Sequence, residues 1–303
     1  MLLEEITERV LTLIALNEVA ESFGHATSGK CTLKVMAASA SEKAIADNMV
    51  NVYSTNGNKG SKGHGLLLTT NGVLVTPYHA IAGIEKDYDA VRKQLEGGKP
   101  VQTHVFAERH YAVWHGKRYA FFPVFFAPDQ RKDIALVKLV IKESNPRPIR
   151  FNIDGNRINQ ATPVKLHYLD DGAVKNINGY VKEESAVENT RNCDVLEDVL
   201  ATDIATRPGY SGSVLTTRKN GTFAGIALSG YEKSRRHMLF WHEDLSHFAK
   251  ATAIAGLISK SAKGLASNLL SDLERPEVRE HVLLPGAAKD LIRRIAEYTS
   301  NPA

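Results

Sequence analysis

The sequence predicts a mainly β protein built of two small barrels, with helical extensions at both ends. Three observations lead to this fold class. From about residue 49 to about residue 240, short apolar segments alternate with turn signals. A polar, proline-bearing segment at 143–148 divides this region into two halves of similar size. The regions before and after it instead carry apolar residues at helical spacing.

The turn signals are glycines preceded by a residue that tolerates a positive φ angle or ends a strand. Tight hairpins need positive φ at their central positions, and Asn-Gly and Asp-Gly pairs supply it at little cost. Several short strands at this spacing favour a barrel or a sandwich. The pairs are Asn71-Gly72, His115-Gly116, Asp171-Gly172, Asn178-Gly179 and Asn220-Gly221.

The two ends of the chain are predicted to be amphipathic helices. We expect a helical extension over 1–45, barrels over about 46–142 and 150–242, and a second helical extension over 243–303. Their apolar faces need a partner surface, which is either the barrels of the same chain or another subunit or regulatory protein. The positions on these faces are Leu3, Ile6, Val10, Leu13 and Ile14; then Leu245, Phe248, Ala249 and Thr252; then Leu265, Leu269, Leu270 and Leu273; and finally Leu291, Ile292 and Ile295 after Pro285.

Composition excludes several classes of protein. The chain has 303 residues, 43% of them hydrophobic and 24% charged, which is typical of a globular fold. The formal net charge is only +4, and Lys and Arg are spread along the chain, so we expect no nucleic-acid partner. The acidic start and the interrupted apolar run at 11–16 do not resemble a signal peptide, and no run reaches the length of a membrane span. We therefore expect a cytoplasmic protein without a membrane partner.

The two cysteines, Cys31 and Cys193, lie far apart and outside any CxxC pattern. They are expected to be unpaired thiols, although a single disulfide remains open. None of the eleven histidines lies in a metal-binding motif such as HExxH. We expect neither a metal nor a cofactor.

The segment TDIATRPGYSGS, at 202–213, is the most informative part of the chain. It is either an ordinary Gly/Ser turn or the loop of a nucleophilic serine, Ser211. Glycines around a serine let the backbone fold sharply and leave Oγ exposed. In that interpretation the backbone N–H groups of Gly209 and Ser211 point at one position and form an oxyanion hole.

Two further segments place a histidine and an aspartate at strand ends. His79 lies just past the apolar run VLVTPY, and Asp133 immediately precedes the apolar run IALVKL. Taken singly, each residue could be an ordinary surface or strand-edge residue. A general base also needs such a placement, fixed by a strand and open to a cleft, and a carboxylate can orient its imidazole.

Taken together in the order His, Asp, Ser, these segments resemble the trypsin-like superfamily, and in particular its HtrA/DegP branch. The matching stretches are GHGLLLTTNGVLVTPYH, DIALVKL and TDIATRPGYSGS, and the resemblance covers about residues 49–240. It implies a chymotrypsin-like double six-stranded antiparallel β-barrel with the active site between the barrels. It also implies that His79 is the base, Asp133 its orienting carboxylate and Ser211 the nucleophile.

The chain departs from the family pattern beside the serine. Tyr210 stands where Asn or Asp is usual, and Ser213 stands where Gly is usual. An uncharged Tyr210 cannot pair with a new N-terminal amine, so we expect no trypsinogen-type activation. No recognisable PDZ module follows the barrels. The specificity pocket is predicted to take an uncharged residue and to be formed by Ala205, Thr206, Leu228, Ser229 and Gly230.

The sequence therefore predicts a cytoplasmic serine endopeptidase that acts on proteins or peptides through a His-Asp-Ser triad and an acyl-enzyme. The alternative is a catalytically degenerate protease fold that binds peptides or partner proteins. The terminal helices are expected to regulate or assemble the protein rather than to take part in the chemistry.

Overall fold

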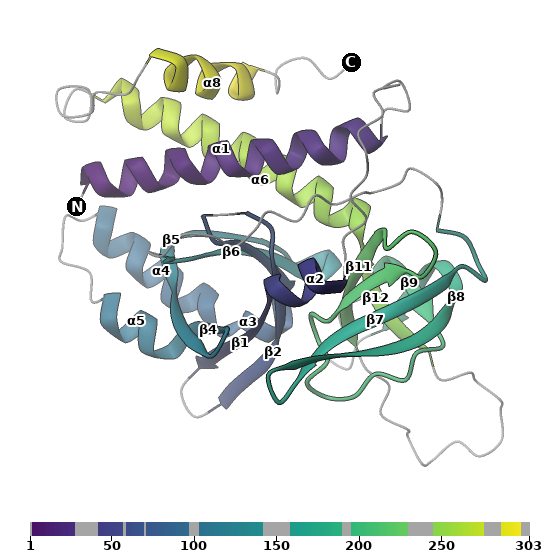
Figure 1. Cartoon of the computed structure of the whole chain (residues 1–303). Helices are drawn as coiled ribbons and strands as arrows, with labels where there is room; N and C mark the ends of the chain where they lie inside the picture. The colour runs from purple at the N-terminus through teal and green to yellow at the C-terminus, as the bar shows by residue number, and fades with distance from the viewer. Residues whose placement is uncertain are drawn as a thin grey trace.

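The structure of the chain is a computed structural model in which two β-barrels lie side by side beneath a layer of helices (Figure 1). It describes residues 2–27, 42–56, 59–69, 71–96, 103–141, 158–189, 195–229, 245–275 and 286–297. Both barrels are closed, antiparallel and six-stranded, as the sequence predicts. Cys31, Cys193, Gly230 and the linker at 143–148 lie outside the described residues.

The first barrel closes in the order β1-β2-β3-β6-β5-β4. Its interior is apolar because alternate strand residues point inward, among them Val52, Leu74 and Val137, each fully buried. The pair His115-Gly116, with φ of 47° and 74°, forms the turn between β4 and β5, as predicted. The strands are β1 (Met49–Asn56), β2 (Lys59–Leu67), β3 (Val73–Pro77), β4 (His110–Trp114), β5 (Lys117–Asp129) and β6 (Ile134–Leu139).

Short helices interrupt the first barrel between β3 and β4. They are α3 (Tyr78–Ile81), α4 (Gly83–Glu96) and α5 (Thr103–Arg109), and a further short helix, α2 (Glu42–Asn48), precedes β1. The hairpin-based prediction did not include them. Ile81, Ile84 and Phe106 are buried in the same core cluster as the barrel interior, so the helices pack against this barrel.

The second barrel closes in the order β10-β11-β12-β9-β8-β7. Asp171 and Gly172, with φ of 50° and 78°, join β7 to β8 in the predicted tight turn, and Gly221 (φ 61°) lies between β10 and β11. The strands are β7 (Pro163–Asp170), β8 (Ala173–Asn189), β9 (Val195–Thr202), β10 (Val214–Thr217), β11 (Phe223–Ser229) and β12 (Ser246–Lys250).

Two local predictions in the second barrel are wrong. Asn178-Gly179 is not a turn but lies inside β8, where a Cβ on Gly179 would come within 2.4 Å of Ile204 and 2.5 Å of the Asp203 carboxylate. The segment around Phe248 and Ala249 is the strand β12, not a helix, because β9 and β11 both pair with it to close the sheet. A short apolar segment does not distinguish the helical period from the strand period. Because β12 belongs to the second barrel, that barrel extends to Lys250 rather than to 242.

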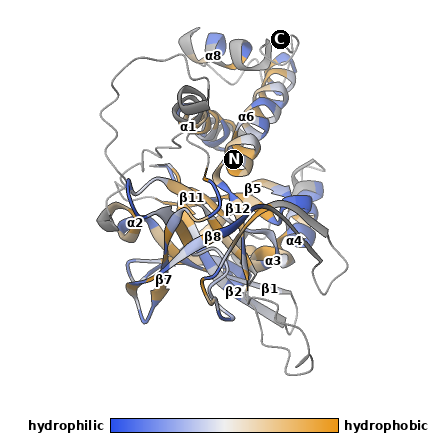
Figure 2. Cartoon of the chain, turned by 90° about the vertical axis from the view of Figure 1, so that its right-hand side faces the viewer, coloured by the Kyte–Doolittle hydropathy of each residue, from blue (hydrophilic) through white to orange (hydrophobic). Residues whose placement is uncertain are grey.

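The terminal helices pack on the barrels of the same chain and on one another. Helix α1 (Leu2–Thr27) contacts α6 (Ala251–Glu274), which also contacts α8 (Gly286–Glu297). Helix α6 contacts β5 and β6 of the first barrel and β11 and β12 of the second. In Figure 2 it carries both hydrophobic and hydrophilic residues along its length, as expected of a helix with one buried face. None of the described helices has the length and apolar character needed to span a membrane.

One core cluster joins the helical layer to both barrels. It contains Leu13 and Leu16 of α1, Ile258 of α6, Leu66 of the first barrel and Ile226 of the second. Polar contacts fix the same arrangement: Arg9 of α1 pairs with Asp272 of α6 at 2.6 Å, and Lys138 of β6 contacts Glu8 of α1. The helices therefore hold the two barrels against each other.

We predict that Leu13→Ala destabilises the fold by about 3 kcal/mol, because it leaves a cavity where a leucine is 0% exposed. Leu11→Ala is the matched control on the same helix. Leu11 is 45% exposed, so its truncation is expected to change the free energy of unfolding by less than about 0.5 kcal/mol. Urea unfolding measures both, and equal losses would contradict the packing of α1 on the barrels.

Candidate active site

His79 lies at the seam between the barrels, on the short helix α3 that directly follows β3. Strand β3 is buried along its whole length, so it holds the position of α3 firmly. The N–H of Tyr78 donates to the Asp133 carbonyl at 3.0 Å, which ties α3 to the start of β6. The His79 side chain remains 44% exposed. It is thus anchored at its base and open to solvent at its ring.

Asp133 presents its carboxylate to His79 through an unusual backbone conformation. It has φ of 49° and ψ of 40° at the end of the turn 130–132, and a left-handed conformation is one that Asp tolerates better than most residues. One carboxylate oxygen accepts the His79 backbone N–H at 2.9 Å, and the other lies 2.6 Å from the ring Nδ1. The two bonds fix both the position of the ring and which ring nitrogen faces the carboxylate.

Ser211 comes from the second barrel and meets the opposite side of the same ring. Its Oγ lies 2.9 Å from His79 Nε2. The loop around it turns through Gly209 (φ 95°) and Gly212 (φ 83°), in a region that favours glycine. The structure therefore brings together His79, Asp133 and Ser211, the three side chains that the sequence singled out.

The Ser211 loop docks on β2 of the first barrel through backbone groups. The N–H of His64 donates to the Ser211 carbonyl at 2.6 Å. A Cβ on Gly212 would lie 1.8 Å from the His64 carbonyl oxygen, so only glycine allows this approach. That oxygen instead accepts the Thr76 hydroxyl at 2.9 Å. The contact sets the separation of the two barrels beside the nucleophile.

A buried side-chain pair lies beneath this backbone contact. His64 is 2% exposed and Ser213 is 0% exposed, and Nδ1 of the histidine lies 3.1 Å from the serine Oγ. Burial lowers the pKa of His64 from 6.5 to about 4, so its ring is neutral near pH 7. Sequence reasoning missed this residue, because His64 lies among the glycines and polar residues of β2, where nothing marks a histidine as buried.

A second polar group links the elements that carry His79 and Asp133. The Tyr78 hydroxyl contacts Glu85 of α4, and Gln130 Nε2 donates to the same hydroxyl at 3.1 Å and to Glu85 Oε1 at 3.2 Å. Burial and the hydrogen bond to Glu85 raise the pKa of Tyr78 to about 12, which keeps its hydroxyl protonated. No motif in the sequence pointed to this cluster, because its members come from three separate elements.

Tyr210, which precedes the nucleophile, stacks on Tyr168 of β7. The ring centroids lie 4.3 Å apart at an interplanar angle of 26°, which is a stacked arrangement. Burial and the hydrogen bond with Tyr168 raise the pKa of Tyr210 to about 12. The Tyr210 side chain, which stands where the family usually has Asn or Asp, is therefore neutral and held by the second barrel.

The described residues among those predicted to form the specificity pocket lie in different environments. The Leu228 carbonyl is 3.5 Å from Ser211 Oγ, and Ser229 pairs with His247 of β12. Ala205 is exposed, whereas Thr206 is 4% exposed and its hydroxyl lies 2.8 Å from that of Ser246. Gly230 falls outside the described residues. The role of this set in substrate binding stays a prediction.

Asp203, an acidic residue close to this pocket in sequence, is already engaged within the barrel. Its Oδ1 accepts the Tyr180 backbone N–H at 2.7 Å, and its Oδ2 lies 3.6 Å from Lys182 Nζ. Within the ranges that the structure describes, no three His, Cys, Asp or Glu side chains gather as metal ligands.

Comparison with protein-family models and with curated proteins finds no match. Among solved structures, the chain is similar to the Rv3671c protease from M. tuberculosis in its active form, with a TM-score of 0.51 and 16% identity over 72% of this chain and 82% of that one. It is also similar to the MamO protease domain from Magnetospirillum magneticum in its apo form, with a TM-score of 0.47 and 15% identity over 70% of this chain and 96% of that one. Together with the two six-stranded barrels, the first likeness shows that the chain has a chymotrypsin-like fold.

Gly212→Ala should destabilise the fold by more than the cost of positive φ alone, about 1–2 kcal/mol, because its Cβ meets backbone rather than a flexible side chain. Gly172→Ala is the matched control, since Gly172 has φ of 78° and nothing within 4 Å of an added Cβ. Urea unfolding of the two variants compares them. Equal losses would show that the barrels do not approach this closely.

Burial of His64 makes stability depend on pH. The unfolded chain binds a proton at His64 near pH 6.5, whereas the folded chain does so only near pH 4. Stability is therefore full above pH 6.5 and falls as pH drops towards 4, by about 3 kcal/mol from this residue. Unfolding free energies measured from pH 7 to pH 4 should fall less steeply in His64→Asn than in the wild type. Parallel slopes would contradict a buried, neutral His64.

Proposed function

We propose that this chain is a serine endopeptidase that hydrolyses peptide bonds through an acyl-enzyme. The observation that carries the proposal is the position of His79, whose Nδ1 lies 2.6 Å from the Asp133 carboxylate and whose Nε2 lies 2.9 Å from Ser211 Oγ. A fold does not by itself specify a function, since one fold can serve many. A nucleophile, a base and an orienting carboxylate in a connected row are what acyl transfer requires.

The proposed steps follow from this row. His79 accepts the Ser211 proton as Oγ attacks the carbonyl carbon of the scissile peptide bond, and it then donates that proton to the leaving amine. Asp133 holds the Nδ1–H and stabilises the imidazolium that forms. A water molecule activated by His79 then attacks the ester, and Ser211 recovers its proton. No step requires a metal or a cofactor.

The backbone of the same loop supplies the proposed oxyanion hole. The N–H groups of Gly209 and Ser211 are assigned this role because glycine at φ 95° lets the peptide at 209 turn towards the nucleophile. Tyr210 N–H and Ser213 N–H, by contrast, donate to the carbonyls of Arg207 and Tyr210 at 3.0 and 2.9 Å, and these bonds keep the loop in shape.

The substrate is proposed to be an extended peptide with an uncharged residue before the scissile bond. Residues 228–230 would pair with its backbone as an added strand, which gives affinity without sequence selectivity. A pocket specific for lysine or arginine needs a carboxylate at its base, and Ala205 carries no charge there. The carboxylate of Asp203 accepts a hydrogen bond from the Tyr180 backbone and lies beside Lys182.

Cleavage of a peptide library is expected to depend on all three side chains. Ser211→Ala and His79→Ala should abolish measurable turnover. Asp133→Asn should lower kcat by about 10⁴-fold if it follows other triads, because the amide no longer stabilises the imidazolium. Rates are measured by mass spectrometry of the cleaved peptides. Thr252→Ala, at an exposed position on α6, serves as the control and should cleave like the wild type.

Retention of full hydrolysis by Ser211→Ala would contradict the assignment of the nucleophile. A wild type that binds library peptides without cleaving any would instead favour the binding module over the enzyme. The pattern of cleavage also tests the pocket, since strict cutting after Lys or Arg would contradict an uncharged specificity site.

A further inference from the structure

Two buried polar side chains meet across the barrel seam directly beneath the Ser211 loop. His64 belongs to β2 of the first barrel, and Ser213 immediately precedes β10 of the second. They are 2% and 0% exposed, and 3.1 Å separates Nδ1 from Oγ. Leaving either group without a partner at this depth would cost about 1–3 kcal/mol, so the hydrogen bond resists separation of the barrels at this point.

The same two residues also bracket the nucleophile through their backbones. The His64 N–H donates to the Ser211 carbonyl at 2.6 Å, and the Ser213 N–H donates to the Tyr210 carbonyl at 2.9 Å. Ser213 is further fixed to β11, because its carbonyl accepts the Ala227 N–H at 2.8 Å. Any change in the distance between His64 and Ser213 therefore moves Ser211, whose backbone lies between these two hydrogen bonds.

The ionisation of His64 suits a permanent contact rather than a switch near neutral pH. Burial lowers its pKa to about 4, while hydrogen bonding with backbone groups of Leu169 and Tyr210 opposes this shift. A neutral imidazole has one donor and one acceptor nitrogen, and a serine hydroxyl can satisfy either. The pair is thus complete without a charge on either side.

We propose that His64 and Ser213 form a positioning pair that holds Ser211 Oγ in register with His79. The inference rests on the proposed function and deepens it, since it assigns a role to two residues outside the row of reacting groups. Ser211 and His79 belong to different barrels, so their 2.9 Å contact persists only if the barrels keep their register. Ser213, one of the two departures from the family pattern, supplies a hydroxyl for that purpose.

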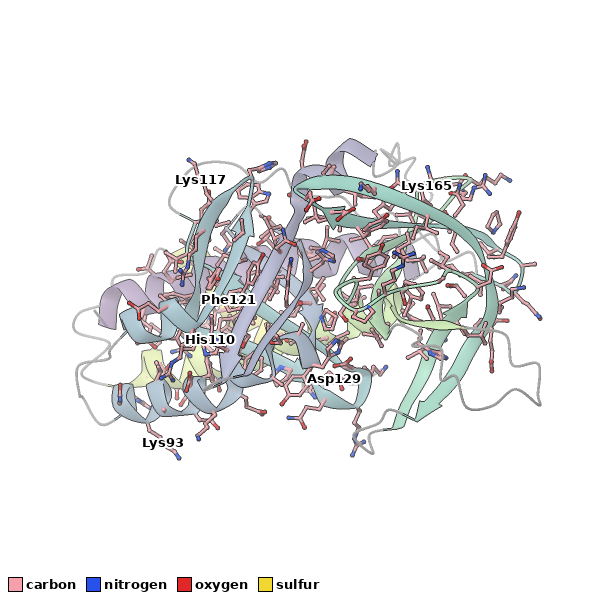
Figure 3. All side chains as sticks on the ribbon, turned by 90° about the horizontal axis from the view of Figure 1, so that it is seen from below. Lys93, His110, Lys117, Phe121, Asp129 and Lys165 are labelled. Atoms are coloured by element: carbon pink, nitrogen blue, oxygen red, sulfur yellow. The ribbon has the colours of Figure 1, made fainter. Side chains whose placement is uncertain are left out.

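A second buried histidine–serine pair provides the matched control. In the first barrel, Nδ1 of His110 lies 2.9 Å from Ser54 Oγ, and the two residues are 0% and 1% exposed. The other ring nitrogen of His110 lies 3.0 Å from Asp87 of α4, on the side of the barrel that carries the helices (Figure 3). Both partners of this pair belong to one barrel, so its loss weakens the fold without acting across the seam.

The experiment compares Ser213→Ala and His64→Leu with Ser54→Ala in the full chain. The burst of p-nitrophenol from p-nitrophenyl acetate reports acylation of Ser211 by a small ester, and thermal unfolding reports stability. We expect acylation to slow by at least about tenfold in the two seam variants, since small misplacements of reacting groups cost up to about 10²-fold. Ser54→Ala should lower the unfolding midpoint but acylate at the wild-type rate. His64→Asn, whose amide can reach Ser213 from nearly the same position as Nδ1, should recover much of the rate.

The outcomes separate this inference from the proposed function. A wild type without a burst would overturn the proposed function and the positioning role with it. A burst at equal rates in the wild type and Ser213→Ala would overturn the positioning role alone, as would slowing of Ser54→Ala by the same factor. If Ser213→Ala does not fold, Ser213→Cys replaces it, because the thiol fills the space of the hydroxyl but forms only a weak hydrogen bond, and the same criteria apply.

Discussion

The contact between the His64 backbone and the Ser211–Gly212 peptide is the constraint on which the candidate site depends. His79 and Asp133 are fixed by the first barrel, whereas Ser211 is fixed by the second, so neither barrel alone holds the three together. A Cβ at position 212 would approach the His64 carbonyl oxygen to 1.8 Å, and the Ser211 carbonyl accepts a 2.6 Å hydrogen bond from the same residue. The barrels therefore have one permitted separation at this point, and that separation places Ser211 Oγ 2.9 Å from His79 Nε2.

The terminal helices reinforce this separation from the far side of the barrels. Helix α6 packs on strands of both barrels, and α1 packs on α6. An ion pair between Arg9 of α1 and Asp272 of α6, at 2.6 Å, joins these two helices. A single core cluster runs from these helices into both sheets. Buried apolar residues of α1, α6 and α8 all belong to this cluster. The extensions therefore support the site structurally, and the contacts among His79, Asp133 and Ser211 involve none of their described side chains.

Sequence reasoning reached the residues whose signals are local. His79, Asp133 and Ser211 each stand at a strand end or a glycine-rich turn, and the structure brings them into contact. It failed where the deciding interactions are non-local. Gly179 looked like a turn glycine, yet its freedom is used for close packing against Ile204. Phe248 matched a helical period, yet the need to close the sheet between β9 and β11 makes it part of a strand. His64 and Ser213 lie 149 positions apart, and nothing in either neighbourhood of the sequence announces their pairing.

The most direct measurement of the central claim is the site at which a fluorophosphonate attaches to the chain. The protein is incubated with the reagent when folded and when unfolded in urea, and the modified residue is located by peptide mass spectrometry. We expect a single adduct, on Ser211, in the folded protein and none after unfolding, because the reactivity depends on barrels docked in register. An adduct on another serine, no adduct at all, or equal labelling of Ser211 in both states would contradict it.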